Sequence, residues 1–226
     1  MKSIIPNGLT ALNLVFGMFA IMQTFHGYYY TAALLIFAAM IADGSDGRAA
    51  RYFKVSSEFG KELDSLCDLV SFGVAPAFLA YVYCLHEFGF LGQVVAVFFA
   101  TCGALRLARF NVNTTTVKGY FMGLPIPAGG CVVATFIMTG IQPSGYWFLG
   151  FVAIFGYLMV STVRYPDFKG KGEKIYRIAI ILAVATGGYL FYALPHSYLF
   201  APFFTYAVFG IFNSILRLLD YKSALS

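Results

Sequence analysis

Long apolar stretches recur along the whole chain, and they constrain its fold more than any other feature. A bilayer core about 30 Å thick is crossed by about 20 mostly apolar helical residues. Eight stretches approach that length, separated by turn-forming residues, and they cover 7–24, 28–50, 60–84, 89–109, 124–141, 145–163, 176–193 and 198–217. The pattern predicts an all-α polytopic membrane protein with about eight transmembrane helices. A different division of the last spans would give six or seven.

The composition favours lipid as the main solvent of this chain. Hydrophobic residues make up 60% of it and charged residues only 11%. A soluble domain of this size has too little interior for so much apolar surface, because small domains expose a large share of their chain. The four cysteines occur singly, without the spacing of a zinc site or a disulfide framework. No linker divides the chain, so residues 1–226 are expected to form a single integral membrane domain.

The basic residues are distributed unevenly among the connections between the spans. All 15 Lys and Arg residues lie at the N-terminus or around 48–61, 106–118, 164–177 and 217–222, and the alternate connections contain none. This is the positive-inside pattern, which places both termini and the basic loops in the cytoplasm. The cell membrane is therefore the expected location. The pattern also accounts for the net charge of +5 without a nucleic-acid partner.

Most of the acidic residues are concentrated at the cytoplasmic ends of the second and third spans. An ionisable residue at membrane depth costs at least ~2.5 kcal/mol, so several carboxylates together need a compensating partner. Asp43 and Asp46 fall on one helical face, and Asp64 and Asp68 lie one turn apart on the next helix. The short link 52–59 lets these helices lie antiparallel. The four carboxylates would then face one another.

Four clustered carboxylates repel one another unless cations lie between them. Oxygen-only ligands suit Mg²⁺, Mn²⁺ or Ca²⁺ rather than zinc. Four acids neutralise two divalent cations, and such a pair is a recognised clamp for displacement at phosphorus. On the same face as Asp43, Gly47 and Ala50 leave room for a bulky ligand, and Arg51 offers a planar fork suited to a diphosphate.

The acidic residues have two other interpretations. Any single aspartate could be the salt-bridge partner of a neighbouring Arg or Lys. A cation-coupled transporter is the alternative from another functional class, since carboxylates inside membranes also line ion paths. The acids lie at one membrane face rather than near the midplane, where transporter sites usually lie, and this position argues against transport.

Eight residues of this region follow a fixed spacing, which is Asp43-x2-Asp46-Gly47-x2-Ala50-Arg51-x8-Gly60-x3-Asp64-x3-Asp68. This spacing resembles the complete signature of the CDP-alcohol phosphotransferase family. The resemblance implies a six-helix catalytic core, over about 1–169 here, with additional C-terminal spans over about 176–217. It also implies a homodimer whose active site faces the cytoplasm.

The resemblance further implies roles for individual residues. The four aspartates Asp43, Asp46, Asp64 and Asp68 would bind two divalent cations, Mg²⁺ or Mn²⁺ and alternatively Ca²⁺, and Asp68 would be the catalytic base. The implied contacts to the CDP-lipid are Gly47, Arg51 and Ser57, together with Asn7, Thr10 and Asn13 in the opening segment of the chain.

Later stretches resemble the phosphatidylserine synthase branch of the family, among them Arg106-Leu-Ala-Arg109-Phe-Asn111. This branch implies transfer of a phosphatidyl group from CDP-diacylglycerol to L-serine, which gives phosphatidylserine and CMP. Arg106 and Arg109 could receive the serine carboxylate, and Asn111 could add a hydrogen bond. Equally, both arginines could set the topology or contact anionic lipids. Another alcohol acceptor, or an archaeal ether lipid as in archaetidylserine synthase, is an alternative within the family.

Overall fold

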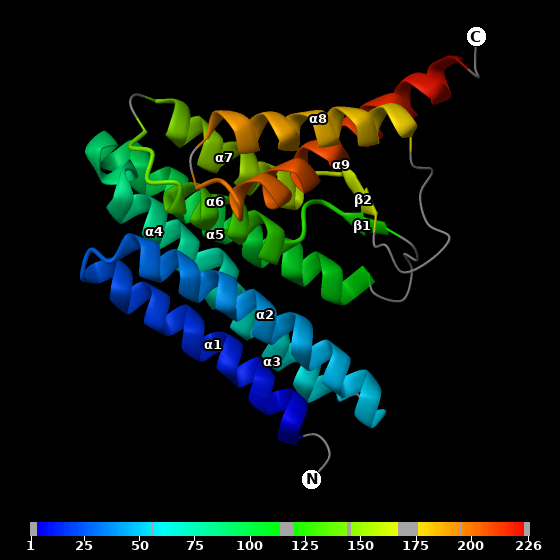
Figure 1. Ribbon diagram of the computed structural model, residues 1–226. Helices are drawn as coiled ribbons and strands as arrows, with labels where there is room; N and C mark the ends of the chain where they lie inside the picture. Colours follow the sequence, from blue (N-terminus) through cyan, green and yellow to red (C-terminus); the bar gives the residue numbers. More distant parts are fainter. Residues whose placement is uncertain are drawn as a thin grey trace.

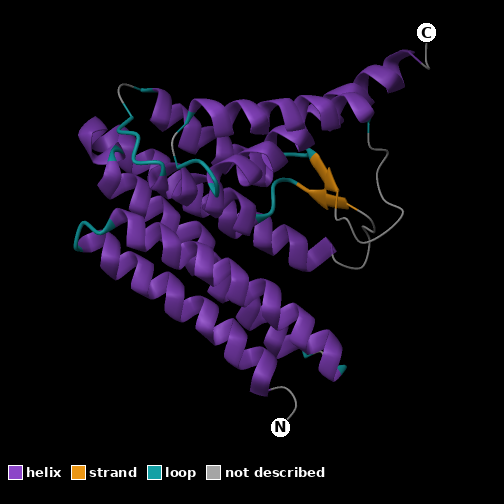
Figure 2. Ribbon diagram, viewed as in Figure 1, coloured by secondary structure: helices purple, strands orange, loops and turns teal. Residues whose placement is uncertain are grey.

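The computed structural model describes residues 4–55, 57–113, 120–143, 146–166, 176–194 and 196–223. These residues form a bundle of helices with one small two-stranded antiparallel β-sheet (Figure 2). The elements are α1 (Ile4–Phe25), α2 (Tyr29–Phe53), α3 (Glu58–Asp68), a π-helical turn (Leu69–Val74), α4 (Ala75–Tyr83), a 3₁₀ turn (Leu85–Phe88), α5 (Gly89–Asn113), β1 (Tyr120–Met122), α6 (Ile126–Met138), α7 (Trp147–Val160), β2 (Arg164–Pro166), α8 (Arg177–Ala193) and α9 (Phe200–Ser223).

Each apolar stretch expected to be a span overlaps a helix, and the third combines α3, the π-helical turn and α4. Among the described residues, four helical segments are long and apolar enough to cross a membrane: Ile4–Phe25, Glu58–Tyr83, Leu85–Val112 and Phe200–Asp220. Three further apolar helices, α6, α7 and α8, are shorter. The result agrees with an all-α membrane protein, while the number of eight crossing helices stays a prediction.

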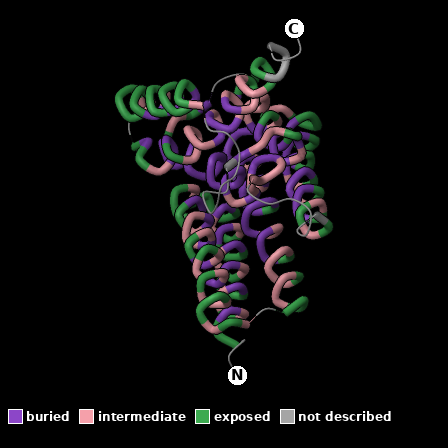
Figure 3. The backbone as a smooth tube through the Cα atoms, turned by 90° about the vertical axis from the view of Figure 1, so that its right-hand side faces the viewer, coloured by how far each residue is buried: buried purple, intermediate pink, exposed green. Residues whose placement is uncertain are grey.

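The outer surface of the bundle is rich in large apolar side chains. Phe90 is 79% exposed and Tyr192 is 92% exposed, and many other aromatic and aliphatic side chains also face outward. Figure 3 shows the buried residues concentrated between the helices and exposed residues along their outer faces. A soluble monomer rarely exposes apolar area on this scale, so these faces suit contact with lipid.

The ends of the helices fall into two groups (Figure 1). The α1–α2, α4–α5 and α8–α9 connections lie at one end of the bundle. The N-terminus of α1, the C-terminus of α2 and the two-stranded sheet lie at the opposite end. The C-terminal ends of α2 and α5, which carry Arg48, Arg51, Arg106 and Arg109, therefore share an end of the bundle. This is the arrangement that the positive-inside pattern requires.

The helix α1 approaches the π-helical turn closely, and a glycine makes this approach feasible. A Cβ at Gly17 would lie only 2.9 Å from the backbone Cα of Ser71. The Ser71 hydroxyl donates to the backbone carbonyl of Asn13 at 2.9 Å. Small residues allow this kind of close helix packing in membranes. The contact fixes α1 beside the end of α3, where Asp68 lies.

The helix α6 lies at the centre of the fold and is buried along almost its whole length. Its Phe136 contacts the rings of Phe148 and Phe151 from α7 and of Phe200 from α9. Aromatic pairs of this kind add to the stability that burial of their area provides. The cluster joins α9 to the core.

The sequence does not predict the two-stranded sheet. Its antiparallel strands pair Phe121 with Tyr165, and β2 packs on α9. The Tyr165 ring is fully buried, and its hydroxyl donates to the carbonyl of Ala207 at 3.3 Å. A Cβ at Gly210 would clash with the Tyr165 ring, so the packing of the sheet on α9 requires glycine at position 210. The expected core boundary at residue 169 lies outside the described residues.

Candidate metal and nucleotide site

Three carboxylates meet at the centre of the candidate site. Asp43 from α2 and Asp64 and Asp68 from α3 each offer an oxygen, and these oxygens lie within 4.8 Å of one another. Asp46 lies one turn along α2 and interacts electrostatically with Asp43 and Asp64. The four aspartates therefore converge, although they lie on two separate helices.

This cluster has the properties of a site for a hard cation. The Asp64 Oδ1 atom is buried and has no hydrogen-bond partner among the described residues. A buried carboxylate oxygen without a partner is costly unless a cation or a donor reaches it. All the ligand atoms are oxygens, which favours Mg²⁺, Mn²⁺ or Ca²⁺. The residues present thus fit a divalent cation.

Two side chains of α1 hold aspartates of the cluster. The Thr10 hydroxyl donates to Asp46 Oδ2 at 2.5 Å, and the Asn13 amide donates to Asp68 Oδ1 at 2.9 Å. Thr10 and Asn13 are both buried. The resemblance implies that both residues contact the CDP-lipid, which stays a prediction, and the structure adds that each donates to a carboxylate of the cluster. Helical spacing within α1 could not indicate these partners, because they lie on other helices.

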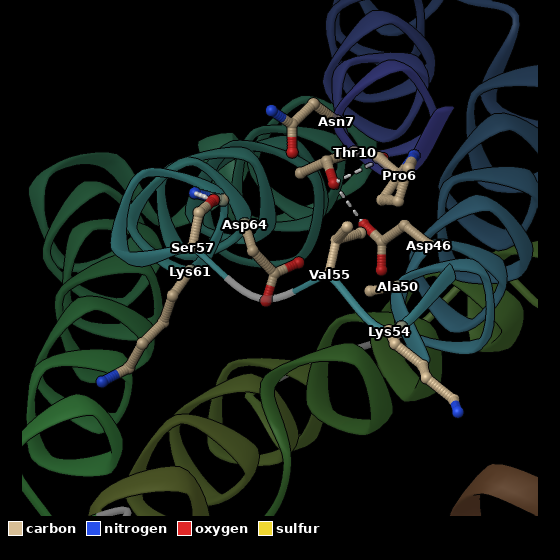
Figure 4. Close-up of a pocket in the computed structure, with 12 residues that line it drawn as sticks. Pro6, Asn7, Thr10, Asp46, Ala50, Lys54, Val55, Ser57, Lys61 and Asp64 are labelled. Atoms are coloured by element: carbon tan, nitrogen blue, oxygen red, sulfur yellow. Dashed lines mark hydrogen bonds between the residues drawn. The ribbon is translucent and has the colours of Figure 1, made fainter. Parts of the chain in front are cut away.

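A cavity of about 580 Å³ opens beside the cluster (Figure 4). Asp46 and Asp64 line it from opposite sides, and their carboxylates point toward the space between α2 and α3. The other lining residues are Pro6, Asn7, Thr10, Gly47, Ala50, Lys54, Val55, Ser57, Gly60 and Lys61. Of the residues expected to contact the CDP-lipid, Asn7, Thr10, Gly47 and Ser57 line the cavity.

The N-terminus of α3 contributes positive electrostatic potential to the cavity. Ser57 caps this helix by accepting a hydrogen bond from the Gly60 backbone N–H at 3.0 Å. Helix N-termini attract phosphate groups because their first N–H groups lack partners within the helix. Lys54 and Lys61 also line the cavity, with their ammonium groups on opposite sides in Figure 4. The sequence interpretation had assigned no ligand role to these lysines.

Arg51 is exposed and lies near the edge of this cavity. One Arg51 guanidinium nitrogen lies 3.6 Å from the position that a Cβ on Gly47 would occupy. The guanidinium therefore folds back over Gly47, which itself lines the cavity. A side chain at position 47 would separate Arg51 from the cavity.

Arg106 is a buried cation beside the carboxylates. Only 6% of its surface is exposed, and it interacts electrostatically with Asp68 and Asp43. It makes no hydrogen bond or salt bridge within the described part of the chain, and its guanidinium lies 5.3 Å from the centre of the Phe110 ring. A buried guanidinium in this state has unused donors.

Arg109 and Asn111 have other partners. The Arg109 guanidinium donates to the backbone carbonyls of Met122, Met159, Val160 and Ser161 at 2.8 to 3.2 Å. It thereby ties α5 to β1 and to the end of α7. The Asn111 amide donates to Ser65 Oγ at 2.9 Å, which ties α5 to α3. Both side chains therefore have partners within the protein, and their predicted role in serine binding stays a prediction.

Comparison with known proteins gives consistent matches. The family model described as CDP-alcohol phosphatidyltransferase matches residues 3–163. A CDP-diacylglycerol–serine O-phosphatidyltransferase of Helicobacter pylori is 42% identical over 171 residues, which are 73% of this chain and 72% of that protein. One from Methanocaldococcus jannaschii is 38% identical over 93% of this chain and 94% of its own length. An archaetidylserine synthase of Methanothermobacter thermautotrophicus is 36% identical over 74% of this chain and 72% of its own length.

Proposed function

The chain belongs to the CDP-alcohol phosphatidyltransferase family, and on that basis we propose that it transfers a phosphatidyl group from CDP-diacylglycerol to L-serine, giving phosphatidylserine and CMP. The observation that carries this proposal is the cavity between α2 and α3, which borders the convergent aspartates. Relatives named for this reaction share 36 to 42% of aligned residues with the chain. The transporter alternative gains no support from these relatives.

We propose that the cavity between α2 and α3 holds the CDP moiety. Its volume of about 580 Å³ lies within the range of small-molecule sites. The diphosphate would lie near the N-terminus of α3, where Ser57 and Lys61 line the wall. Gly47 lets the ligand approach the α2 backbone, and Arg51 would reach the diphosphate over it. Asn7 lines the same cavity from α1 and would contact the nucleotide.

Asp43, Asp46, Asp64 and Asp68 would hold two divalent cations, Mg²⁺ or Mn²⁺. When bound, the cations would neutralise charge on the diphosphate and on the leaving CMP. The protein's own contribution is to hold the carboxylates in place, which Thr10 and Asn13 do through their hydrogen bonds.

Asp68 would act as the general base. The serine hydroxyl oxygen forms a bond to the lipid-side phosphorus, and its proton passes to an Asp68 carboxylate oxygen. The bond between that phosphorus and the bridging oxygen breaks, and CMP leaves with the electron pair. Asp68 is 6% exposed and Asn13 holds one of its oxygens, so the carboxylate is fixed for this transfer. General base catalysis typically contributes ~10²–10⁴-fold.

Arg106 would bind the serine carboxylate. It is the buried cation whose donors lack partners in the described residues, and it lies beside Asp68. A bidentate pair between guanidinium and carboxylate would satisfy those donors. We do not extend this role to Arg109, because four backbone carbonyls already accept from it.

We also propose a cellular location and an oligomeric state for the enzyme. The site would face the cytoplasm from the cell membrane, because the basic C-terminal ends of α2 and α5 share its end of the bundle. The protein would function as a homodimer, as the family resemblance implies. An ether lipid is the second candidate donor, since one relative is an archaetidylserine synthase.

The test is release of CMP by the purified protein in liposomes with Mg²⁺ or Mn²⁺. CDP-diacylglycerol and its ether-lipid counterpart serve as donors, and L-serine, glycerol 3-phosphate and inositol phosphate are supplied separately. We expect serine-dependent release that a chelator and Asp68→Asn abolish. Glu62→Gln is the matched control, because it replaces an exposed acid of the same helix. Release with another acceptor and none with serine would contradict the proposal.

A further inference from the structure

Lys54 has a backbone conformation that lysine rarely adopts. It directly follows α2, and its φ of 52° and ψ of 41° lie in the left-handed region. Its backbone N–H donates to the carbonyl of Arg51 at 3.2 Å, and the N–H of Val55 donates to the carbonyl of Ala50 at 3.0 Å. Glycine is usual at this position of a helix end, because it adopts the left-handed conformation without steric cost. A residue held there against this preference points to a function for its side chain.

The side chain of Lys54 lines the cavity beside the aspartates. It is exposed, and Ala50 and Val55 line the cavity next to it. Figure 4 shows Lys54 beside Ala50, with its ammonium on the opposite side of the cavity from that of Lys61. Among the described residues, none forms a hydrogen bond or an ion pair with the Lys54 ammonium. This cation is therefore available to a ligand that occupies the cavity.

The two lysines of the cavity differ in their contacts. Lys61, in the first part of α3, donates to the backbone carbonyl of Asn111 at 3.4 Å. Its ammonium thus has a partner within the protein, whereas that of Lys54 has none in the described residues. The CDP moiety carries its negative charge on its phosphates alone. A phosphate oxygen is therefore the partner that a ligand in the cavity would offer to Lys54.

We propose that Lys54 is a further binding residue for the lipid donor and that its ammonium binds a phosphate oxygen of the CDP moiety. This inference rests on the proposed function, which supplies CDP-diacylglycerol as the donor. Arg51 precedes Lys54 by three residues, so two cations from the end of α2 would meet the diphosphate. The N-terminus of α3 would approach the diphosphate from the other wall of the cavity. A glycine at position 54 would fit the turn equally well but would lose this contact.

The experiment measures the binding of CDP and of cytidine to the purified protein in detergent with Mg²⁺, by titration calorimetry. Cytidine keeps the base and the ribose but has no phosphate, so the comparison isolates the phosphate contact. The test variants are Lys54→Gly, which removes the side chain, and Lys54→Arg, which keeps the positive charge.

Two further variants are matched controls. Arg48→Gln removes an exposed positive charge of α2 that does not line the cavity. His196→Gly changes the other non-glycine residue with a positive φ in the described part of the chain, at 58°. His196 lies in the connection between α8 and α9, at the opposite end of the bundle from Lys54 (Figure 1). This variant therefore repeats the backbone change of Lys54→Gly away from the cavity.

We expect Lys54→Gly to weaken CDP binding about three- to tenfold at low ionic strength, because a charge-assisted contact is lost. The loss should shrink as salt is added, since salt screens exposed charges. Lys54→Arg and both controls should bind CDP within about twofold of wild type, and all variants should bind cytidine equally. The unfolding temperatures of Lys54→Gly and His196→Gly should equal or exceed that of wild type, because glycine relieves the left-handed backbone.

Three results would overturn the proposal: an unchanged CDP affinity in Lys54→Gly, an equal loss in Arg48→Gln, or an equal loss for CDP and cytidine. Failure of the wild type to bind CDP would overturn it as well. Serine-dependent CMP release is measured on the same preparations. A loss of CDP binding in Lys54→Gly, together with no CMP release by the wild type, would support the phosphate contact and reject the proposed function.

Discussion

The amide of Asn13 donates to Asp68 Oδ1 at 2.9 Å, while the carbonyl oxygen of the same side chain is buried without a hydrogen-bond partner in the described residues. One end of the amide thus holds a carboxylate, and the other end has unused acceptor capacity. Buried polar atoms without partners are rare in folded proteins and need a specific reason. In the proposed mechanism, Asn13 is a positioning residue that aims the catalytic base.

Replacing Asn13 should therefore slow catalysis more than it weakens substrate binding. Loss of a hydrogen bond to a charged group costs about 1.5–3 kcal/mol, which corresponds to a fall in kcat of about 10–100-fold for Asn13→Ala. Steady-state CMP release at saturating substrates measures this. Thr24→Ala is the control, because Thr24 is equally buried on α1 and bonds only within its own helix. A wild-type kcat for Asn13→Ala would show that Asp68 needs no such support.

Thr10 offers a test of the metal assignment. Its hydroxyl holds Asp46 at 2.5 Å, and loss of a group that orients a metal ligand typically weakens metal affinity 10–100-fold. We expect Thr10→Val to raise the Mn²⁺ concentration for half-maximal activity at least about tenfold. The control Thr101→Val removes an exposed hydroxyl on α5 that bonds only to the carbonyl of Val97. Equal Mn²⁺ requirements for the two variants would argue against Asp46 as a ligand.

The sequence was sufficient for the positions of the helices and for the convergence of the aspartates. Apolar length located the helices, and helical periodicity placed Asp43 and Asp46 on one face and Asp64 and Asp68 on another. The predicted link 52–59 overlaps the break between Phe53, where α2 ends, and Glu58, where α3 begins. The helices and their faces depend on neighbours within about one turn, which is the range over which a sequence pattern is informative. The convergence of the two faces depends in addition on the short link, which makes α2 and α3 antiparallel neighbours.

Features that depend on contacts between distant segments were not predictable in this way. The strands Tyr120–Met122 and Arg164–Pro166 are too short to show alternation, and they pair across α6 and α7. Arg106 and Arg109 lie three residues apart on one helix, so periodicity treats them alike. In the structure Arg109 donates to carbonyls of β1 and of the end of α7, whereas Arg106 interacts electrostatically with the carboxylates. Only the tertiary fold separates their roles.

The close approach of α1 to the π-helical turn predicts a sharp difference between two glycines. A Cβ at Gly17 would lie 2.9 Å from Ser71 Cα, which is backbone and cannot rotate away, whereas a Cβ at Gly8 meets nothing within 4 Å. Overpacking of this kind costs about 1–3 kcal/mol. Gly17→Ala should lower the thermal unfolding temperature in detergent, and Gly8→Ala should preserve or raise it. Equal unfolding temperatures would mean that α1 does not pack so closely.

Arg109 either supports the fold through its carbonyl contacts or binds the serine carboxylate. A substitution that keeps its positive charge separates these two interpretations. Its guanidinium spans carbonyls from two segments, at Met122 of β1 and at the end of α7. A lysine ammonium lacks the planar fork needed to reach both. If Arg109 is structural, Arg109→Lys leaves partly buried carbonyls without donors, which lowers the stability of the fold.

We therefore expect Arg109→Lys to unfold at a lower temperature than Arg48→Lys, which changes an exposed arginine of α2. The KM values of Arg109→Lys for serine and for the lipid donor should change by the same factor, because the contacts of α5 with β1 and α7 support the site as a whole. An unchanged unfolding temperature with a selective rise in the KM for serine would instead restore Arg109 to the acceptor site. In that case the carbonyl contacts would be incidental, and both arginines of the helix would act on the serine carboxylate.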